Sequence, residues 1–187
     1  MESPQETCPS HLGGSDGIAH LDVWSLDYLK TKYNIKTMID IGCGLGGMVA
    51  VARSMEIEAV GIDGDPTLTP DVSHDFTKGK AYVLKDHNHF DLAWSTEFLE
   101  HVEEQYQDNY MDLFSKSSYA LVTAAPPGKK GTHHVNCQTS KYWIEVFDKY
   151  GFDIQREETN HIRDNNSMQR EFMSLYGLFF KNRNVNE

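Results

Sequence analysis

Cysteine is scarce in this sequence, and its scarcity limits the kind of protein it encodes. The 187 residues contain three cysteines, Cys8, Cys43 and Cys137, and no Cys-x-x-Cys pair. An odd number of irregularly spaced cysteines argues against a disulfide framework and in favour of a reducing compartment. We therefore expect the fold to be held by its hydrophobic core.

Long hydrophobic runs are also missing. No apolar stretch approaches the roughly 18 residues that a membrane-spanning helix needs. The first residues, Met-Glu-Ser-Pro-Gln-Glu-Thr, have neither the basic nor the apolar region of a secretion signal. These absences predict a cytoplasmic protein without a membrane partner.

Basic side chains are outnumbered. Seventeen Lys and Arg face 28 Asp and Glu, which gives a formal net charge of −11. Affinity for nucleic acid comes largely from Lys and Arg on phosphates, so nucleic acid is an unlikely partner. Only Lys129 and Lys130 form an adjacent basic pair. The length fits one domain, and 39% hydrophobic residues are enough for a packed core.

Glycine, by contrast, is concentrated at one point. The apolar run Met38-Ile39-Asp40-Ile41 is followed by four glycines within six positions, 42, 44, 46 and 47. A buried strand that ends in a glycine-rich turn and opens a helix is typical of nucleotide-cofactor sites. Gly42 and Gly44 permit positive φ and let a ligand approach bare backbone. The following helix offers its N-terminal amides to that ligand.

Two carboxylates refine this prediction. Asp63 ends the apolar run 59–62, about twenty residues after Gly42, where a ribose diol would be held. Asp40 lies inside the first strand, where it would add negative charge beside a pyrophosphate. It suits a cationic ligand with an amino-acid head, such as S-adenosylmethionine. The pattern favours a methyl donor over NAD, and an NAD-dependent oxidoreductase stays as an alternative.

The segment Asp40-Ile-Gly-Cys-Gly-Leu-Gly resembles motif I of class I S-adenosylmethionine-dependent methyltransferases. Later segments agree with that superfamily in order and spacing: 60–63, 74–76, 90–102 and 119–128. The resemblance covers roughly residues 37–152. It implies a methyltransferase with an α/β fold: a doubly wound, mostly parallel seven-stranded sheet with an antiparallel edge strand. A non-catalytic S-adenosylmethionine-binding module is a second alternative.

The pattern of apolar residues and turns places the elements. We expect strands at 37–41, 58–62, 71–76 or 81–85, 90–95, 119–124, 152–156 and 176–181. Helices are expected near 21–33, 47–55, 104–117 and 140–150, with Thr139 or Ser140 as a cap and Gly151 as a stop. Residues 1–20 are expected to form a flexible N-terminal segment that could act as a lid, and residues 21–187 a single domain.

The resemblance also assigns a cofactor site. Asp75 and Phe76 would meet the adenine, and Ser95 lies at the end of the fourth strand. The expected cofactor-binding residues are Asp40, Gly42, Cys43, Gly44, Asp63, Gly64, Asp75, Phe76 and Ser95. Position supports this site, since ligands of open α/β sheets lie outside the carboxyl ends of the strands.

Three side chains are candidates for the chemistry. His133 and His134 lie in a Gly- and Pro-rich loop after the fifth strand, and a neutral imidazole there could accept a proton. Glu97, after the fourth strand, is the rival base. His101 is expected to line the site or support it. We expect no metal, because His133 and His134 are neighbours that point apart.

The acceptor is less well defined. No Asp/Asn-Pro-Pro-Tyr/Phe motif of amino-methylating DNA enzymes is present, and the charge disfavours DNA. We expect a small-molecule acceptor, with a sugar or glycan precursor as the leading class and oxygen as the methylated atom. Nothing in the sequence indicates an oligomeric state.

Overall fold

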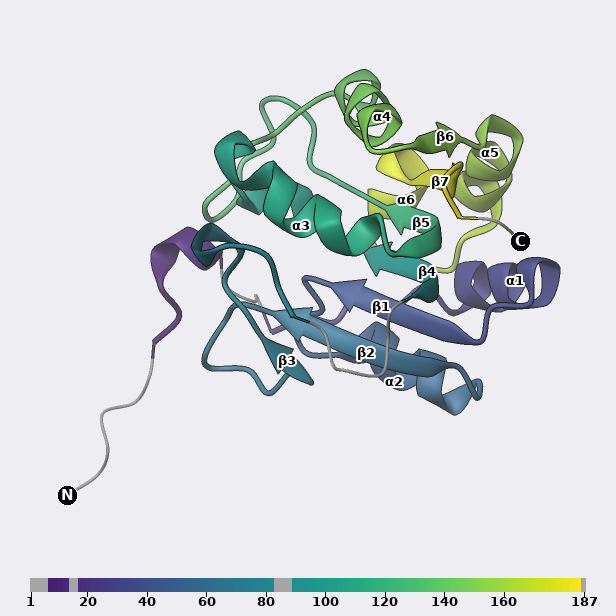
Figure 1. The fold of residues 1–187 in the computed structure, drawn as a ribbon, viewed down its shortest axis with the longest axis horizontal. Coiled ribbons are helices and arrows are strands. Elements are labelled where there is room, and N and C mark those ends of the chain that lie inside the picture. Colours follow the sequence, from purple (N-terminus) through teal and green to yellow (C-terminus); the bar gives the residue numbers. More distant parts are fainter. Residues whose placement is uncertain (1–6, 14–16, 83–88, 186–187) are drawn as a thin grey trace.

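A single seven-stranded sheet organises the molecule (Figure 1). The computed structural model describes residues 7–13, 17–82 and 89–185. Within them the strand order is β3-β2-β1-β4-β5-β7-β6. The strands are β1 (Thr37–Ile41), β2 (Glu58–Asp63), β3 (Val72–Ser73), β4 (Phe90–Ser95), β5 (Ser117–Val122), β6 (Phe152–Ile154) and β7 (Leu178–Asn182).

Strand directions confirm the predicted doubly wound fold. β1 to β5 pair in parallel, and β7 pairs antiparallel with both β5 and β6. The antiparallel strand therefore lies between β5 and β6, and β6 at the edge runs in the direction of β5. The sheet order reverses between β2 and β4, on the two sides of β1. Ligands of open α/β sheets bind at such a switch point.

Helices cover both faces of the sheet. The helices α3 (Gln107–Phe114) and α4 (Ser140–Lys149) pack on one face. On the other face lie α1 (Val23–Tyr33), α2 (Gly47–Ser54), α5 (Arg156–Asn165) and α6 (Phe172–Tyr176). The described residues also contain four short 3₁₀ turns: η1 (Ser10–Leu12), η2 (Phe76–Lys78), η3 (Leu99–His101) and η4 (Glu104–Tyr106).

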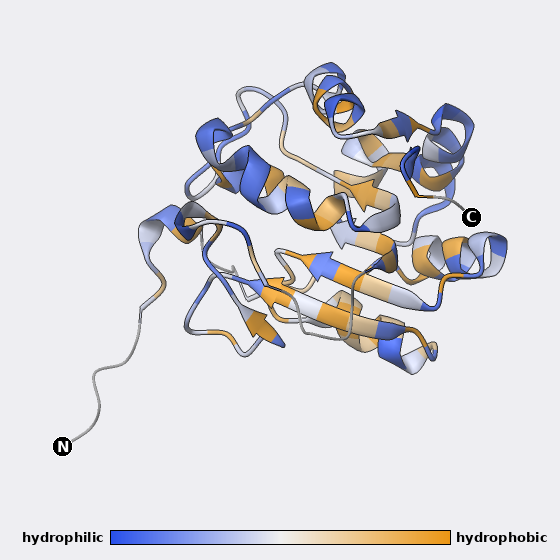
Figure 2. Cartoon of the chain, viewed as in Figure 1, coloured by the Kyte–Doolittle hydropathy of each residue, from blue (hydrophilic) through white to orange (hydrophobic). Residues whose placement is uncertain are grey.

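Two hydrophobic clusters fill the space between these layers. Successive side chains of a strand point to opposite faces. On β1, Met38 joins the cluster under α1 and α2, whereas Ile39 and Ile41 join the cluster under α3 and α4. On β4, Trp94 belongs to the first and Ala93 to the second. The strands are accordingly hydrophobic over much of their length (Figure 2), as expected for a sheet buried on both sides.

Most expected elements are present, with informative differences. β1 and β4 have the predicted bounds, and the Thr139 side chain caps α4 by accepting from the amide of Tyr142. The third strand lies within the first of the two expected ranges, as the short β3. Residues 83–85 of the other range lie outside the described residues. β5 starts two residues earlier than expected.

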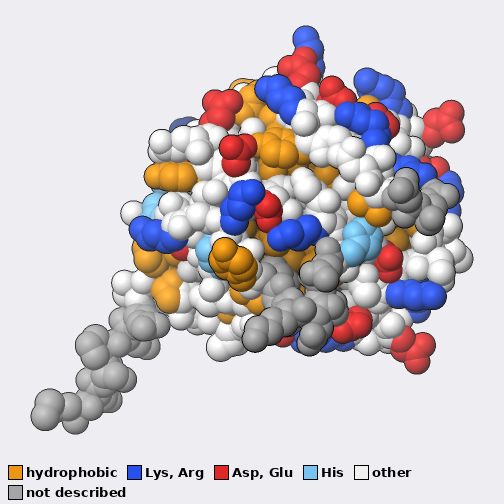
Figure 3. Space-filling model, viewed as in Figure 1, with side chains coloured by type: hydrophobic (Ala, Val, Ile, Leu, Met, Phe, Trp, Pro, Cys, Tyr) orange, Lys and Arg blue, Asp and Glu red, His pale blue; other side chains and the backbone are white. Residues whose placement is uncertain are grey.

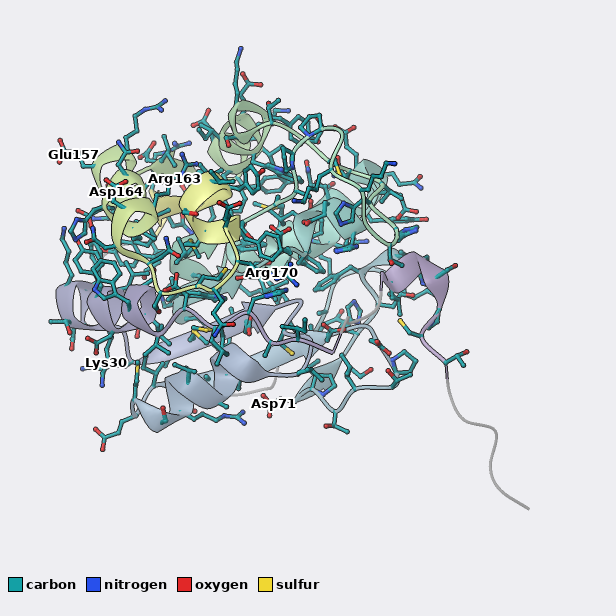
Figure 4. All side chains as sticks on the ribbon, turned by 180° about the vertical axis from the view of Figure 1, so that it is seen from behind. Lys30, Asp71, Glu157, Arg163, Asp164 and Arg170 are labelled. Atoms are coloured by element: carbon teal, nitrogen blue, oxygen red, sulfur yellow. The ribbon has the colours of Figure 1, made fainter. Side chains whose placement is uncertain are left out.

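The helices α5 and α6 were not predicted. α5 is polar along most of its length and buries only Thr159 and Ile162, so few apolar residues mark it in the sequence. Tertiary contacts hold it instead. Arg163 of α5 donates from Nε to the carbonyl of Gly177 at 2.8 Å (Figure 4). The buried Asp22 caps α1 through the amide of Ser25 and also accepts from the amide of Ser167.

No helix in the described ranges is both long and apolar enough to cross a membrane.

Candidate active site

A cavity of about 450 Å³ opens at the carboxyl ends of β1, β2 and β4. Its size is in the range of small-molecule and cofactor sites. Most of its lining residues come from the N-terminal segment, the glycine turn after β1, the end of β2, the start of η2, the segment after β4 and the loop after β5. Among the lining residues are His11, Leu12, Ala19, Asp40, Gly42, Cys43, Gly44, Asp63, Gly64, Asp75, Phe76, Glu97, His101, Lys129, Lys130 and His134.

The glycine turn has the conformation that only glycine adopts easily. Gly42, Gly44 and Gly46 have φ of 76°, 52° and 72°. A Cβ on Gly42 would lie 2.5 Å from the Phe98 ring, so that glycine is required by packing. A Cβ on Gly44 would have no neighbour within 4 Å. The space beside Gly44 is therefore open to the cavity, as a cofactor turn requires.

Asp63 fixes this turn from the neighbouring strand. One carboxylate oxygen accepts from the amide of Gly44 at 2.8 Å, and the other accepts from the amide of Asp65 at 2.9 Å. Burial raises the pKa of Asp63, and these amide hydrogen bonds oppose the rise. These hydrogen bonds show that Asp63 holds the glycine turn in place.

At Asp40, unlike at Asp63, no amide hydrogen bond opposes the rise in pKa that burial causes. Asp40 is 4% exposed, and burial, followed by the charge of Asp63, raises its pKa to about 8. The carboxyl is therefore mostly protonated at neutral pH while the cavity holds no cation. A ligand that brings an ammonium group to it would favour the ionised form.

The adenine candidates, Asp75 and Phe76, stand at the start of η2. Asp75 caps η2 by accepting from the amide and hydroxyl of Thr77, and its second oxygen is 2.9 Å from His11 Nε2. Burial alone would raise the pKa of Asp75, but hydrogen bonds from His11 and Thr77 lower it overall. Phe76 is buried and packs edge-on against Phe98 and Tyr110. Both residues line the cavity.

The three remaining cofactor candidates differ in placement. Cys43 and Gly64 line the cavity, and burial, then the charge of Asp40, raises the pKa of the Cys43 thiol. Ser95 does not line it. Its fully buried hydroxyl donates to the carbonyl of Ile41 at 2.7 Å and joins β4 to β1. Position at a strand end suggested a ligand contact, but the side chain points into the sheet.

Glu97 lines the same cavity. It has φ of 52°, an uncommon conformation for a non-glycine residue and one often found at functional sites. The Thr123 hydroxyl donates to its carboxylate at 2.9 Å, and the Glu97 amide donates to the same hydroxyl at 3.0 Å. Burial raises the pKa of Glu97, although the Thr123 hydrogen bond opposes it.

The turn η3 places two further titratable groups beside Glu97. Glu100 is fully buried, and burial, then the charge of Glu97, raises its pKa well above the ordinary value. Burial, then the charge of His134, lowers the pKa of His101 to about 4. His101 is therefore neutral at neutral pH.

The two candidate histidines of the loop after β5, His133 and His134, have different surroundings. The carbonyl of Glu100 accepts from the amides of Val135 and Asn136, both at 3.0 Å, and this fastens the loop to η3. His134 lines the cavity, with its ring edge-on to His101 at 4.9 Å between centroids. His133 is not among the lining residues; its Nε2 lies 3.6 Å from Glu103. Of the two candidates for the chemistry in this loop, His134 lines the cavity and His133 does not.

The sequence did not lead us to expect that Glu100 lies buried beside Glu97, or that His101 contacts His134. The spacing Glu97-x-x-Glu100-His101 was a signal for the first contact, since three residues make one 3₁₀ turn. The contact between His101 and His134 depends on how the loop after β5 folds back on η3. The course of a loop leaves no periodic pattern in the sequence.

Comparisons with known proteins agree with this geometry. A family described as "Methyltransferase domain" matches residues 39–113. This match and the fold agree with the resemblance to class I S-adenosylmethionine-dependent methyltransferases that the sequence carries. No curated protein matches its sequence significantly.

Solved structures share the fold of this methyltransferase at low identity. The sugar N-methyltransferase KedS8 from Streptoalloteichus sp. ATCC 53650 is 10% identical, with a TM-score of 0.61 over 85% of each chain. A TehB-like S-adenosylmethionine-dependent methyltransferase from Corynebacterium glutamicum is 14% identical, with a TM-score of 0.60 over 86% of each chain. The plantazolicin methyltransferase BpumL, in complex with SAH, is 12% identical, with a TM-score of 0.54 over 86% of this chain and 82% of that one.

The family match decides between the cofactors that the sequence left open. The protein is an enzyme that uses S-adenosylmethionine, and neither the NAD-dependent oxidoreductase nor the non-catalytic module is retained.

Proposed function

We propose that this methyltransferase transfers the methyl group to an oxygen of a small-molecule acceptor. The observation that carries the proposal is that one cavity is lined both by cofactor candidates and by titratable groups. The glycine turn, Asp40 and Asp63 are the cofactor candidates, and Glu97, His101 and His134 are the titratable groups. A half-buried carboxylate and two imidazoles are suited to accept the proton that a hydroxyl loses.

In this proposal Asp63 binds the ribose hydroxyls, Asp40 the ammonium group, and Asp75 with Phe76 the adenine. The amides at the start of α2 face the methionine carboxylate. Ser95 has no cofactor contact and supports the sheet. Each assignment follows from the side chain's place on the cavity wall and the charge it offers there.

Glu97 is the proposed base. It lines the cavity, Thr123 holds its carboxylate, and removal from water makes a carboxylate a stronger proton acceptor. Methyl transfer breaks the sulfonium C–S bond, leaves its electrons on sulfur and forms a C–O bond. The hydroxyl proton passes to Glu97. Orientation of donor and acceptor supplies much of the acceleration.

The acceptor class is inferred from the cavity rim. Lys129 and Lys130, the adjacent basic pair, line an otherwise acidic cavity. They fit an acceptor that carries a phosphate or carboxylate, such as a nucleotide sugar. The sugar N-methyltransferase among the similar structures is consistent with this class, although it modifies nitrogen.

The N-terminal segment is the proposed lid. His11 pairs with Asp75, Leu12 lies against Gly64, and Gly13 lies against the His101 ring. The segment thus contacts both cofactor candidates and one of the titratable groups. Residues 1–6 and 14–16 of the expected flexible segment lie outside the described residues.

A turnover screen tests the function. S-adenosylhomocysteine formation would be followed with nucleotide sugars, neutral sugars and small amines. We expect turnover with a hydroxyl acceptor, and a fall in kcat of about 10²–10⁴-fold in Glu97→Gln with unchanged S-adenosylhomocysteine affinity. Methylation of amines alone, or full activity of Glu97→Gln, would overturn the proposal.

A further inference from the structure

Three side chains with metal-binding atoms meet beside the proposed acceptor position. Glu100 and His101 belong to η3, and His134 comes from the loop after β5. One ligand atom from each lies within 4.8 Å of the other two. Two of the three, His101 and His134, also line the cavity.

Glu100 is not explained by packing alone. It is 0% exposed, and among the described residues neither carboxylate oxygen meets the geometry of a hydrogen bond, although the Glu97 carboxyl and the Ala125 amide lie close to it. The buried Nδ1 of His101 is also without such a partner there. A buried carboxyl is neutral, paired or bound to a metal, because an isolated buried charge is strongly disfavoured. One ligand that binds Glu100 and His101 together would satisfy the polar atoms of both side chains.

His134 is held in the tautomer that a metal needs. Its Nδ1 lies 3.1 Å from the carbonyl of Lys129, which can only accept, so Nδ1 carries the proton and Nε2 has a free lone pair. A backbone carbonyl on the other ring nitrogen is typical of metal-binding histidines. Gly131 leaves room for this ring, since a Cβ there would lie 2.1 Å from Nε2.

We propose that Glu100, His101 and His134 bind a divalent transition metal ion beside the proposed acceptor position. Two imidazoles and one carboxylate suit Zn²⁺, Mn²⁺ or Fe²⁺, whereas Mg²⁺ and Ca²⁺ prefer sets of oxygen ligands. Three protein ligands leave coordination positions free, as in catalytic sites. The expectation of no metal rested on His133 and His134 as the pair, but the second imidazole is that of His101.

The role of the ion rests on the proposed function, whereas its binding does not. A free coordination position beside Glu97 would take the acceptor oxygen. Coordination lowers the pKa of a bound hydroxyl and fixes its direction of attack. The oxygen then forms the C–O bond as the C–S bond breaks, and its proton passes to Glu97, which remains outside the ligand set.

Metal binding can be measured without any acceptor. Tag-free protein would be stripped with a chelator, dialysed and titrated with Zn²⁺, Mn²⁺ and Co²⁺ by calorimetry, with Co²⁺ also followed by visible absorption. We expect one ion per chain. Glu100→Gln, His101→Gln and His134→Gln should each weaken binding by about 10-fold or more, the scale found for groups around metal sites.

The chain supplies matched controls. Glu103→Gln and His133→Gln change the neighbouring pair that stands outside the cluster, and both should bind the metal as the wild type does. S-adenosylhomocysteine binding by every variant verifies that it is folded. The metal should raise the Tm of the wild type and of both controls but not of the ligand variants.

The proposal fails if the wild type binds none of the three ions, or if His133→Gln loses as much affinity as His134→Gln. Stoichiometric metal binding without methyl transfer to any oxygen acceptor would support the site and contradict the proposed function instead. Loss of turnover in stripped protein, restored by one of the ions, would support both.

Discussion

Gly42 and Gly44 lie two residues apart in one turn and carry different constraints. Both have positive φ, but a Cβ would strike the Phe98 ring at Gly42 and meet nothing at Gly44. The space beside Gly44 belongs to the cavity. Substitution at the two positions should therefore have separable effects.

We expect Gly44→Val to abolish cofactor binding and leave the fold intact, because the side chain would occupy ligand space. Strain from positive φ costs of order 1–3 kcal/mol. Gly42→Val should instead destabilise the protein strongly, because Phe98 must move. Calorimetry with S-adenosylhomocysteine and thermal melts of both variants measure this. Normal affinity in a folded Gly44→Val protein would show that the turn is only structural.

Asp40 should couple cofactor binding to a proton. Its pKa of about 8 in the free protein must fall when an ammonium group binds, so the complex holds fewer protons. Affinity for S-adenosylhomocysteine should then rise with pH through neutrality and level off above about 8. The amino group of the ligand titrates in the same region, at roughly 7.7–8.0 for an α-amino group.

Asp40→Asn separates the two titrations. The ligand's own titration persists in this variant, and the difference from the wild type is due to Asp40. Calorimetry in buffers of different ionisation enthalpy would show net proton release at neutral pH in the wild type alone. An identical pH dependence in both proteins would remove Asp40 from the ammonium contact.

At the scale of elements, the end of β2 supports the turn between β1 and α2. Asp63 accepts from the amide of Gly44, so one carboxylate links two neighbouring strand ends. The same side chain is the proposed ribose partner. A loss of affinity could therefore come from the loop or from the ribose.

Asp63→Ala should weaken S-adenosylhomocysteine binding by about 1–3 kcal/mol, the scale for hydrogen bonds to charged groups. A ligand analogue without the ribose hydroxyls should lose less affinity on the same substitution. Calorimetry with both ligands decides between the two roles. Equal losses would mean that Asp63 acts only by holding the turn.

Elements also show where prediction from sequence succeeded. β1, β4 and the start of α4 follow from apolar runs and a threonine cap, which are local signals. α5 was missed because its contacts are tertiary, such as the Arg163–Gly177 hydrogen bond. Ser95 was misplaced because strand position does not reveal which way a side chain points.

At the scale of the molecule, the topology brings the site together. The glycine turn, Asp63 and Glu97 follow three adjacent strands, so their meeting could be predicted from a parallel sheet. The cluster of Glu100, His101 and His134 could not, since it depends on two backbone hydrogen bonds from the loop to the Glu100 carbonyl. On the face shown in Figure 3, acidic and basic side chains are interspersed and form no continuous basic patch.

The central claim is that one cavity holds S-adenosylmethionine at the glycine turn with its reactive methyl directed at Glu97. A crystal structure with S-adenosylhomocysteine tests it most directly. The account predicts ribose hydroxyls within hydrogen-bond distance of Asp63, about 2.6–3.2 Å, the amino group near Asp40, and the sulfur facing Glu97. A ligand bound elsewhere, or with its sulfur turned away from Glu97 and His134, would contradict it.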